Sequence, residues 1–228
     1  MKDKQEEIRL DIPIFGPDAY SLNVAKIRSA RTLSGRKFRE CTTVESMIIS
    51  ALDFIKVIKP KIFDLSSLQI GRIVKMPEGI VANPPMNNRG DTILKRDKIK
   101  NFIDSARKIK IGKGNIYLGE NDFGFAEYET FQHDAQDCKT FLEGGLARIL
   151  EHSAQSAQPF KVIANSKIYK RGMDVYSFHP ANKIVEQVVC LKSRGYLADV
   201  LLVSCNDLDD YSYDIDYDNT GIALGLTL

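Results

Sequence analysis

The chain has 228 residues, of which 43% are hydrophobic and 27% charged; these values are typical of a globular protein and exclude wholesale disorder. Its four cysteines are scattered, which favours reduced thiols over a disulfide framework. No apolar run approaches the roughly 18 residues that a membrane span needs, and the first residues show no secretory signal. We therefore expect a cytoplasmic protein that does not contact a membrane.

The net charge is +2, but it is divided unevenly along the chain. Residues 1–118 contain 23 Lys and Arg against 13 Asp and Glu (+10), whereas residues 119–228 contain 9 against 17 (−8). A basic half favours a polyanionic partner such as nucleic acid. The alternative is that the two halves neutralise each other across the fold or across a dimer.

The N-terminal part of the chain predicts two strands followed by a helix. Residues 8–15 alternate apolar and polar side chains, which predicts a strand that ends at Gly16-Pro17. Residues 20–41 begin with a similar alternation and become polar, which predicts a strand running into a basic loop. Residues 42–59 form the clearest helix, with an apolar stripe and a capping box made by Thr42 and Glu45.

The middle of the chain predicts strands around a second helix. Residues 61–76 predict one or two strands, and residues 77–91 an irregular loop rich in Pro, Asn and Gly. Residues 97–114 predict a helix with Asp97 as its N-cap. Residues 115–131 alternate on both sides of an Asn-Asp pair, which predicts a β-hairpin.

The last part of the chain predicts a βαβ unit. Residues 134–158 predict a helix, 160–165 a strand, 180–195 a helix and 196–204 a buried strand, expected to be parallel and central. An acidic loop and a short apolar strand follow. Together these elements predict a single mixed α/β (α+β) domain over residues 1–228, with a mixed central sheet, a β-hairpin and flanking helices.

Two carboxylates in the predicted hairpin raise a chemical question. Side chains two residues apart in a strand point the same way, so Glu127 and Glu129 are expected about 7 Å apart on one face. Such a pair is stable beside a cation, which a divalent metal or a Lys or Arg supplies. The alternative is a hairpin whose outer face simply becomes polar near its end.

Residues 114–152 resemble the catalytic core of the PD-(D/E)xK nuclease superfamily. Glu127-Tyr128-Glu129 matches the Glu-x-Glu form of its motif, and a helix and an apolar strand are expected to follow. The resemblance implies a Mg²⁺-dependent DNA endonuclease, such as a type II restriction enzyme acting as a homodimer on a short duplex site. Its metal ligands would be Glu127 with Asp122 or Glu120. Glu129 would replace the usual lysine, and His133 would be an auxiliary base.

A basic segment, residues 26–39, contains six cations and no acid. Arg, Ser and Thr at this density suit phosphate contacts, and the forked Arg side chain can read guanine edges. The alternative is a solvated basic loop. The residues expected to contact double-stranded DNA are Arg28, Arg31, Ser34, Arg36, Lys37, Arg39, Arg89, Lys95 and Arg96.

Two other classes of function stay open. A non-catalytic nucleic-acid-binding or assembly protein would keep the basic surface and use Glu127 and Glu129 structurally. A metal-free enzyme of the base-excision or ADP-ribosyltransferase type is the other class, since a Glu-x-Glu pair also occurs in ADP-ribosyltransferases. His152 and His179 match no zinc spacing with the cysteines, and no Walker loop or Gly-x-Ser-x-Gly elbow occurs.

Overall fold

The structure is a computed structural model with a mixed α+β fold, as predicted. It describes residues 12–18, 20–54, 68–85, 92–94, 96–120, 123–155, 157–165, 174–176, 178–192, 196–201 and 221–228. None of the helices in these ranges is long and apolar enough to cross a membrane.

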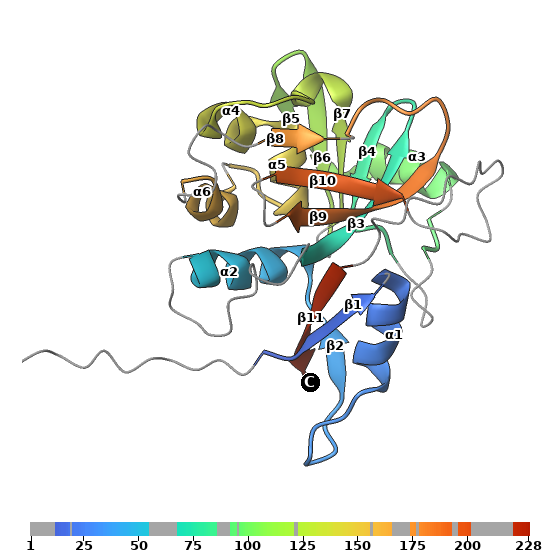
Figure 1. The fold of residues 1–228 in the computed structure, drawn as a ribbon. Coiled ribbons are helices and arrows are strands. Elements are labelled where there is room, and N and C mark those ends of the chain that lie inside the picture. Colours follow the sequence, from blue (N-terminus) through green and yellow to red (C-terminus); the bar gives the residue numbers. More distant parts are fainter. Residues whose placement is uncertain are drawn as a thin grey trace, which may run out of the picture.

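A large sheet runs through the described part of the molecule (Figure 1). Its main path consists, in spatial order, of β5 (Arg107–Ile111), β6 (Gly114–Leu118), β7 (Gly124–Glu127), β4 (Gly79–Ala82), β3 (Leu68–Met76), β9 (Val185–Lys192), β10 (Tyr196–Leu201) and β8 (Asp174–Tyr176). Neighbouring strands on this path are antiparallel, apart from the parallel pair β10 and β8. The central strands are therefore hydrogen-bonded on both sides.

A smaller group of strands is attached below the main path in Figure 1. β11 (Gly221–Thr227) pairs antiparallel with β1 (Ile14–Asp18) and with β2 (Phe38–Glu40). β11 also joins β3 through one parallel pair, Ile222 with Leu68. The two ends of the described chain thus meet in this group.

Helices cover both faces of the sheet (Figure 1). One face carries α2 (Thr43–Phe54), α4 (Cys138–Glu143), α5 (Gly145–Leu150) and α6 (Gln158–Ala164); the other carries α1 (Tyr20–Ser29) and α3 (Arg96–Ser105).

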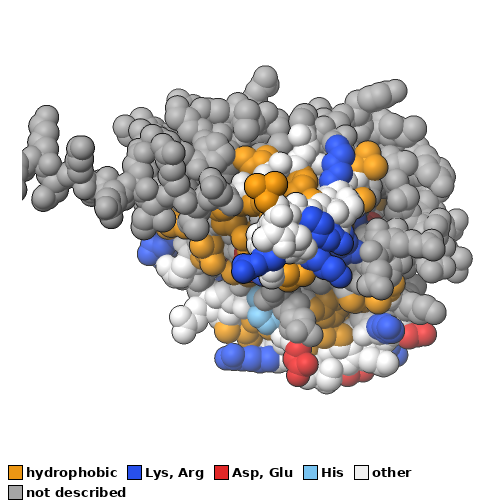
Figure 2. Space-filling model, turned by 90° about the horizontal axis from the view of Figure 1, so that it is seen from below, with side chains coloured by type: hydrophobic (Ala, Val, Ile, Leu, Met, Phe, Trp, Pro, Cys, Tyr) orange, Lys and Arg blue, Asp and Glu red, His pale blue; other side chains and the backbone are white. Residues whose placement is uncertain are grey.

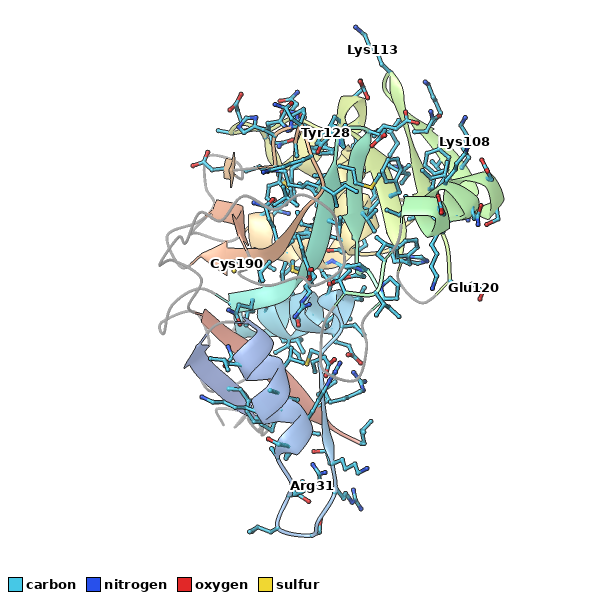
Figure 3. The ribbon with its side chains drawn as sticks, turned by 90° about the vertical axis from the view of Figure 1, so that its right-hand side faces the viewer. Arg31, Lys108, Lys113, Glu120, Tyr128 and Cys190 are labelled. Carbon is cyan, nitrogen blue, oxygen red and sulfur yellow. The ribbon has the colours of Figure 1, made fainter. Side chains whose placement is uncertain are left out.

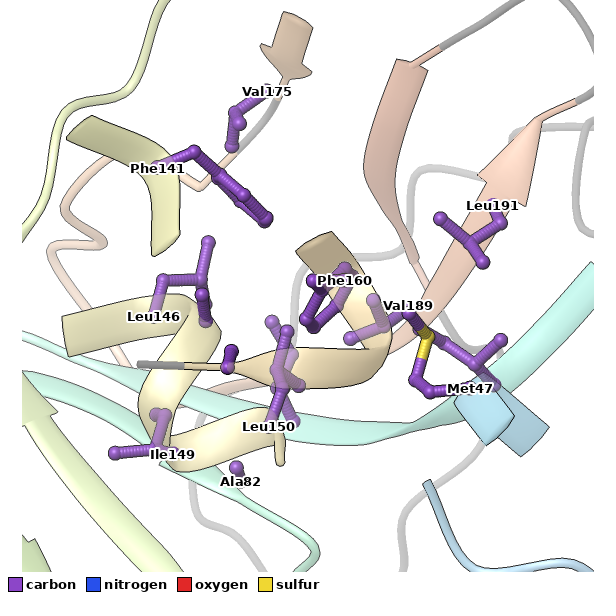
Figure 4. Packing of buried hydrophobic residues seen from close by; sticks show 14 of the residues in the cluster. Met47, Ala82, Phe141, Leu146, Ile149, Leu150, Phe160, Val175, Val189 and Leu191 are labelled. Carbon is purple, nitrogen blue, oxygen red and sulfur yellow. The ribbon is translucent and has the colours of Figure 1, made fainter. Parts of the chain in front are cut away.

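The alternation of side chains along each strand produces these two apolar layers. In β4, Ile80 and Ala82 join the large cluster beneath α4, α5 and α6 (Figure 4), whereas Val81 joins the cluster beneath α3. In β6, Ile116 and Tyr117 divide in the same way. Every residue of β3 and β4 is buried because both faces of these strands are covered, and in β3 this includes the polar side chains of Gln69, Arg72 and Lys75.

One ion pair is buried between β3 and β9. Arg72 Nη1 lies 2.9 Å from Glu186 Oε1, and the two side chains are 5% and 1% exposed. The hydroxyl of Thr92 donates to the same carboxylate oxygen at 2.6 Å. The charge of Glu186 is thus neutralised and hydrogen-bonded inside the fold.

Several predicted elements are confirmed. The helix predicted at 42–59 is confirmed as α2 up to Phe54, and residues 55–59 lie outside the described residues. Its capping box is present: the Thr42 N–H donates to Glu45 Oε2 at 2.8 Å, and the Glu45 N–H donates to Thr42 Oγ1 at 3.2 Å. The hairpin predicted at 115–131 is formed by β6 and β7. The helix predicted at 97–114 begins at Arg96, with Asp97 in its first turn, but ends at Ser105, where β5 follows.

The predicted C-terminal βαβ unit is wrong. Residues 160–165, predicted as a strand, lie almost wholly in α6, and residues 180–195, predicted as a helix, contain β9. β9 and β10 are antiparallel neighbours, so the unit is a β-ribbon. Its second strand is parallel only to β8, at the end of the main path.

Three further predictions need correction. Residues 20–29, predicted to begin as a strand, form α1, because Val24 and Ile27 are buried at helical spacing. The irregular loop predicted at 77–91 contains β4. The helix predicted at 134–158 is divided into α4 and α5 at Gly144, which has an extended backbone.

Candidate functional site

The carboxylate of Glu127 holds the β6–β7 hairpin together. Asn115 lies opposite Glu127 at the end of the hairpin, and its backbone N–H donates to Glu127 Oε2 at 2.8 Å. The Asn115 side-chain amide donates to both carboxylate oxygens at 3.0 and 3.1 Å. The Tyr117 hydroxyl donates to Oε1 at 3.1 Å, and burial together with this carboxylate raises the pKa of Tyr117. Glu127 is therefore already satisfied by neutral donors.

Glu129 does not share a strand face with Glu127, so this expectation is wrong. β7 ends at Glu127, and residues Tyr128–Thr130 form the short 3-10 helix η2. Glu129 is exposed there, while Tyr128 and Thr130 are buried. The Thr130 hydroxyl donates to the Glu127 carbonyl at 2.5 Å and stabilises the change in direction. Glu127 and Glu129 therefore do not form a carboxylate pair on one strand face.

The predicted magnesium ligands are not brought together by the described residues. Glu120 is exposed beside the hairpin turn, and Asp122 lies outside the described residues. Within the described ranges, no three His, Cys, Asp or Glu side chains gather in a way that could hold a metal ion. Both oxygens of Glu127 accept hydrogen bonds, some of which a metal ion would have to displace. The magnesium site remains a prediction.

His133 instead lies beside His179, a contact that sequence reasoning missed. The two ring centroids are 5.1 Å apart, and Phe131 packs edge-on against His133 at the same centroid distance. Burial and the neighbouring His179 lower the pKa of His133, against the opposing effect of a hydrogen bond with the Phe178 backbone. His133 Nδ1 is buried without a hydrogen-bond partner among the described residues. The pair offers two imidazole ligands, whereas a catalytic zinc site has three protein ligands.

The basic segment forms a projecting hairpin between α1 and β2, which we call the basic arm (residues 31–37). Arg31 and Lys37 are paired antiparallel, and the Thr32 N–H donates to the Arg36 carbonyl at 3.0 Å. The Gly35 N–H donates to the Thr32 carbonyl at 2.9 Å. Gly35 has φ +81°, a conformation that glycine adopts without strain. The arm is thus a hydrogen-bonded turn.

The cations of the basic segment divide into two groups. Arg28 pairs with Glu40, and Arg39 binds both oxygens of Glu45 at 2.7 Å. Burial would raise the pKa of Glu40, but Arg28 more than offsets this effect and lowers it. These two arginines therefore stabilise the base of the arm, a structural role that was not predicted.

The cations of the arm itself are exposed. Arg36 and Lys37 have no carboxylate partner among the described residues, and Arg31 donates only to the backbone carbonyls of residues 28 and 30, at 2.9 and 2.6 Å. The exposed Ser34 hydroxyl lies 2.8 Å from that of Thr32. Figure 2, viewed from this end of the molecule, shows Lys and Arg side chains gathered at the centre of the face. Arg31, Ser34, Arg36 and Lys37 are thus available to a ligand.

The remaining predicted DNA contacts cannot be placed. Arg89 and Lys95 lie outside the described residues. Arg96 is the first residue of α3, but its side chain is not among those described. A different basic group lies on β5 and its turn, where Arg107, Lys108, Lys110 and Lys113 are exposed. Among the described strands β5 is at an edge of the sheet, and lysines on such an edge disfavour pairing with other chains.

The basic arm and the predicted catalytic residues lie at opposite ends of the molecule. Figure 3 labels Arg31 at the lower tip and Tyr128, which directly follows Glu127, near the upper end. Lys108 and Lys113 also lie at the upper end. The arm and Glu127 therefore belong to separate regions of the molecule.

Comparisons of the chain with protein families, with curated proteins and with solved structures find no match.

Proposed function

We propose that this protein binds nucleic acid, with double-stranded DNA as the expected form, through the basic arm. The observation that carries the proposal is a hydrogen-bonded hairpin that projects from the fold and exposes Arg31, Arg36 and Lys37. Residues 26–39 contain no acid that would repel phosphates. The two acids nearest along the chain, Glu40 and Glu45, are neutralised by Arg28 and Arg39.

The expected binding mode is electrostatic. Residues opposite each other in an antiparallel pair have Cα atoms about 5 Å apart, so the three cations lie close together at the tip. Binding to phosphates releases counterions, and the slope of log K against log [salt] is about −0.9 for each phosphate neutralised. The arm should therefore contribute a slope of about −2 to −3.

The test is a fluorescence-anisotropy titration of a labelled mixed-sequence duplex at several salt concentrations. We expect Arg36→Gln/Lys37→Gln to weaken binding and to make the salt slope shallower by about 2. The matched control is Lys139→Gln/Lys161→Gln, which removes the same charge from exposed positions on α4 and α6. Equal affinity and slope in the arm variant and the wild type would refute the proposal.

Cleavage by this protein stays a prediction, because Glu127 would have to exchange its hydrogen bonds for a metal ion. The same duplex incubated with Mg²⁺, Mn²⁺ or EDTA measures cleavage directly, beside Glu127→Gln. Metal-dependent fragments that are lost in the variant would establish the endonuclease and would require a rearranged hairpin or a second subunit. Binding without fragments supports the non-catalytic alternative, in which Glu127 is structural.

A further inference from the structure

An apolar side chain stands at the tip of the basic arm. Leu33 has a relative exposure of 112%, the largest among the exposed large hydrophobic residues of the described chain. It follows Thr32 in the turn closed by the Gly35 N–H, so it lies in the turn that ends the arm. Figure 3 shows the arm extending beyond the rest of the fold at the end marked by Arg31.

The position of Leu33 gives the fold no benefit. A side chain that stays in water contributes no burial energy to folding, and single exposed apolar residues are common on protein surfaces. Leu33 differs from such residues in its surroundings: it lies in a hydrogen-bonded turn between Arg31 on one side and Arg36 and Lys37 on the other. A polyanion with an apolar interior matches this combination of charge and apolar surface.

We propose that Leu33 is a wedge that inserts between stacked base pairs from the minor groove and kinks the duplex, while the arm cations contact the flanking phosphates. Proteins that bend DNA in this way use an apolar side chain to unstack one base step, and the bend increases the contact with protein. Flexible pyrimidine–purine steps such as TA are the expected insertion sites. This inference rests on the proposed function and extends it from the binding of DNA to the bending of DNA.

A lipid surface suits the arm less well. Lipid-binding basic clusters usually contain about four to eight cations, whereas the arm exposes Arg31, Arg36 and Lys37. A single leucine is also a small membrane anchor compared with the apolar face of an amphipathic helix. Duplex DNA is therefore the partner that the arm fits.

The test uses a short duplex with one central TA step, dyes at its two ends and 2-aminopurine in place of the central adenine. Wild-type protein should raise energy transfer between the dyes and raise 2-aminopurine fluorescence, because the duplex bends and the base unstacks. Leu33→Ser should lose both signals but keep the salt slope of the wild type. Leu33→Phe should retain both signals, because it preserves an apolar wedge.

The outcomes separate the wedge from the proposed function. Binding by the wild type without either signal, or signals that persist in Leu33→Ser, would overturn the wedge and leave nucleic-acid binding intact. Absence of duplex binding, or Leu33-dependent binding to anionic vesicles in its place, would overturn both. Circular dichroism and thermal unfolding of each variant establish that its fold is unchanged.

Discussion

Among single residues, Glu151 shows most clearly how burial changes the chemistry of a side chain. It is 7% exposed, and its carboxyl group accepts a hydrogen bond from the Phe160 N–H, in the first turn of α6, at 2.6 Å. Burial raises the pKa of Glu151 from 4.5 to about 8, and the Phe160 hydrogen bond offsets only part of this effect. The folded protein therefore keeps a proton that the unfolded chain releases at lower pH.

The consequence for stability has a defined sign. Between pH 4.5 and about 8, the unfolded chain binds fewer protons at this site, so the free energy of unfolding falls as the pH rises. We expect Glu151→Gln, which cannot ionise, to resemble the wild type near pH 4.5 and to be more stable at pH 8.5. The difference should be a few kcal/mol at most, at about 1.4 kcal/mol per pKa unit.

Urea unfolding of both proteins across this pH range measures the effect. Glu143→Gln removes an exposed carboxylate from α4 and is the control. Parallel stability profiles for the wild type and Glu151→Gln would show that Glu151 ionises normally in the folded state.

At the scale of elements, the N-terminus of α2 joins a helix cap to an ion pair. Glu45 accepts from the Thr42 N–H and from both Nη atoms of Arg39, on the neighbouring β2. The hydrogen bond with Arg39 is the main reason that the pKa of Glu45 falls to about 2. Because a lowered pKa favours the ionised form, this stabilisation is present above pH 4.5 and is lost as the pH falls towards 2.

We expect Thr42→Ala to destabilise the protein by about 1 kcal/mol, the usual cost of removing a cap. Glu45→Gln should cost about 1 kcal/mol or less at pH 7, because solvent screens this half-exposed pair. The cost of Glu45→Gln should disappear near pH 2, where Glu45 becomes protonated, whereas most of the cost of Thr42→Ala should remain, because the bond from the Glu45 N–H to Thr42 Oγ1 involves no ionisable group. Denaturant unfolding at pH 7 and at low pH distinguishes the two, and an unchanged cost of Glu45→Gln at low pH would contradict the assignment.

The sequence predicted α2 correctly because its apolar residues and its cap are local signals, although the buried side of the helix carries Met47 and Ala51 and Ile48 is 44% exposed. β9 carries no such signal: Val188 and Cys190 are buried on one face, and Val189 and Leu191 on the other. A run that is apolar on both sides has no period that separates strand from helix. The helix predicted over residues 134–158 likewise stops at Pro159, although this proline lies in the first turn of α6.

At the scale of the whole molecule, the basic and acidic halves of the chain are interleaved in one sheet. β3 and β4 come from the basic half, and their neighbours β9 and β7 come from the acidic half. Arg72 and Glu186 therefore meet across β3 and β9 and neutralise each other inside the fold. This pair supports the alternative that the two halves of the chain partly neutralise each other. The exposed arm accounts for another part of the uneven charge distribution.

Arg72→Met should be severely destabilising, by about 3–5 kcal/mol, because it leaves the Glu186 charge buried without its partner. The double variant Arg72→Met/Glu186→Met should recover much of this loss, since it buries no charge. Guanidinium unfolding of the two single variants and the double variant gives the coupling energy. Additive losses would contradict a direct coupling between the two side chains.

Only part of the predicted site could be inferred from the sequence, because its contacts depend on strand register and on the packing of distant segments. The place of Glu127 at the end of a hairpin strand follows from local alternation, but its bonds to Asn115 and Tyr117 depend on the register of β6 and β7. The contact between His133 and His179 depends on how distant segments pack, which no local pattern records. The arm was recognised from composition alone, because a run of cations without acids remains exposed in most folds.

The pairing of β11 also sets the order in which the molecule can be assembled during translation. β2 leads directly out of the arm, and its partner strand is β11, with Arg39 opposite Leu226 and Phe38 opposite Thr227. The ribosome releases residues 31–40 early and residues 221–227 last among the described strands. A nascent chain thus carries the sequence of the arm long before it carries the strand that supports it. The arm acquires the support of β11 only after translation has passed residue 227, whereas the ion pairs at its base, with Glu40 and Glu45, involve residues translated early.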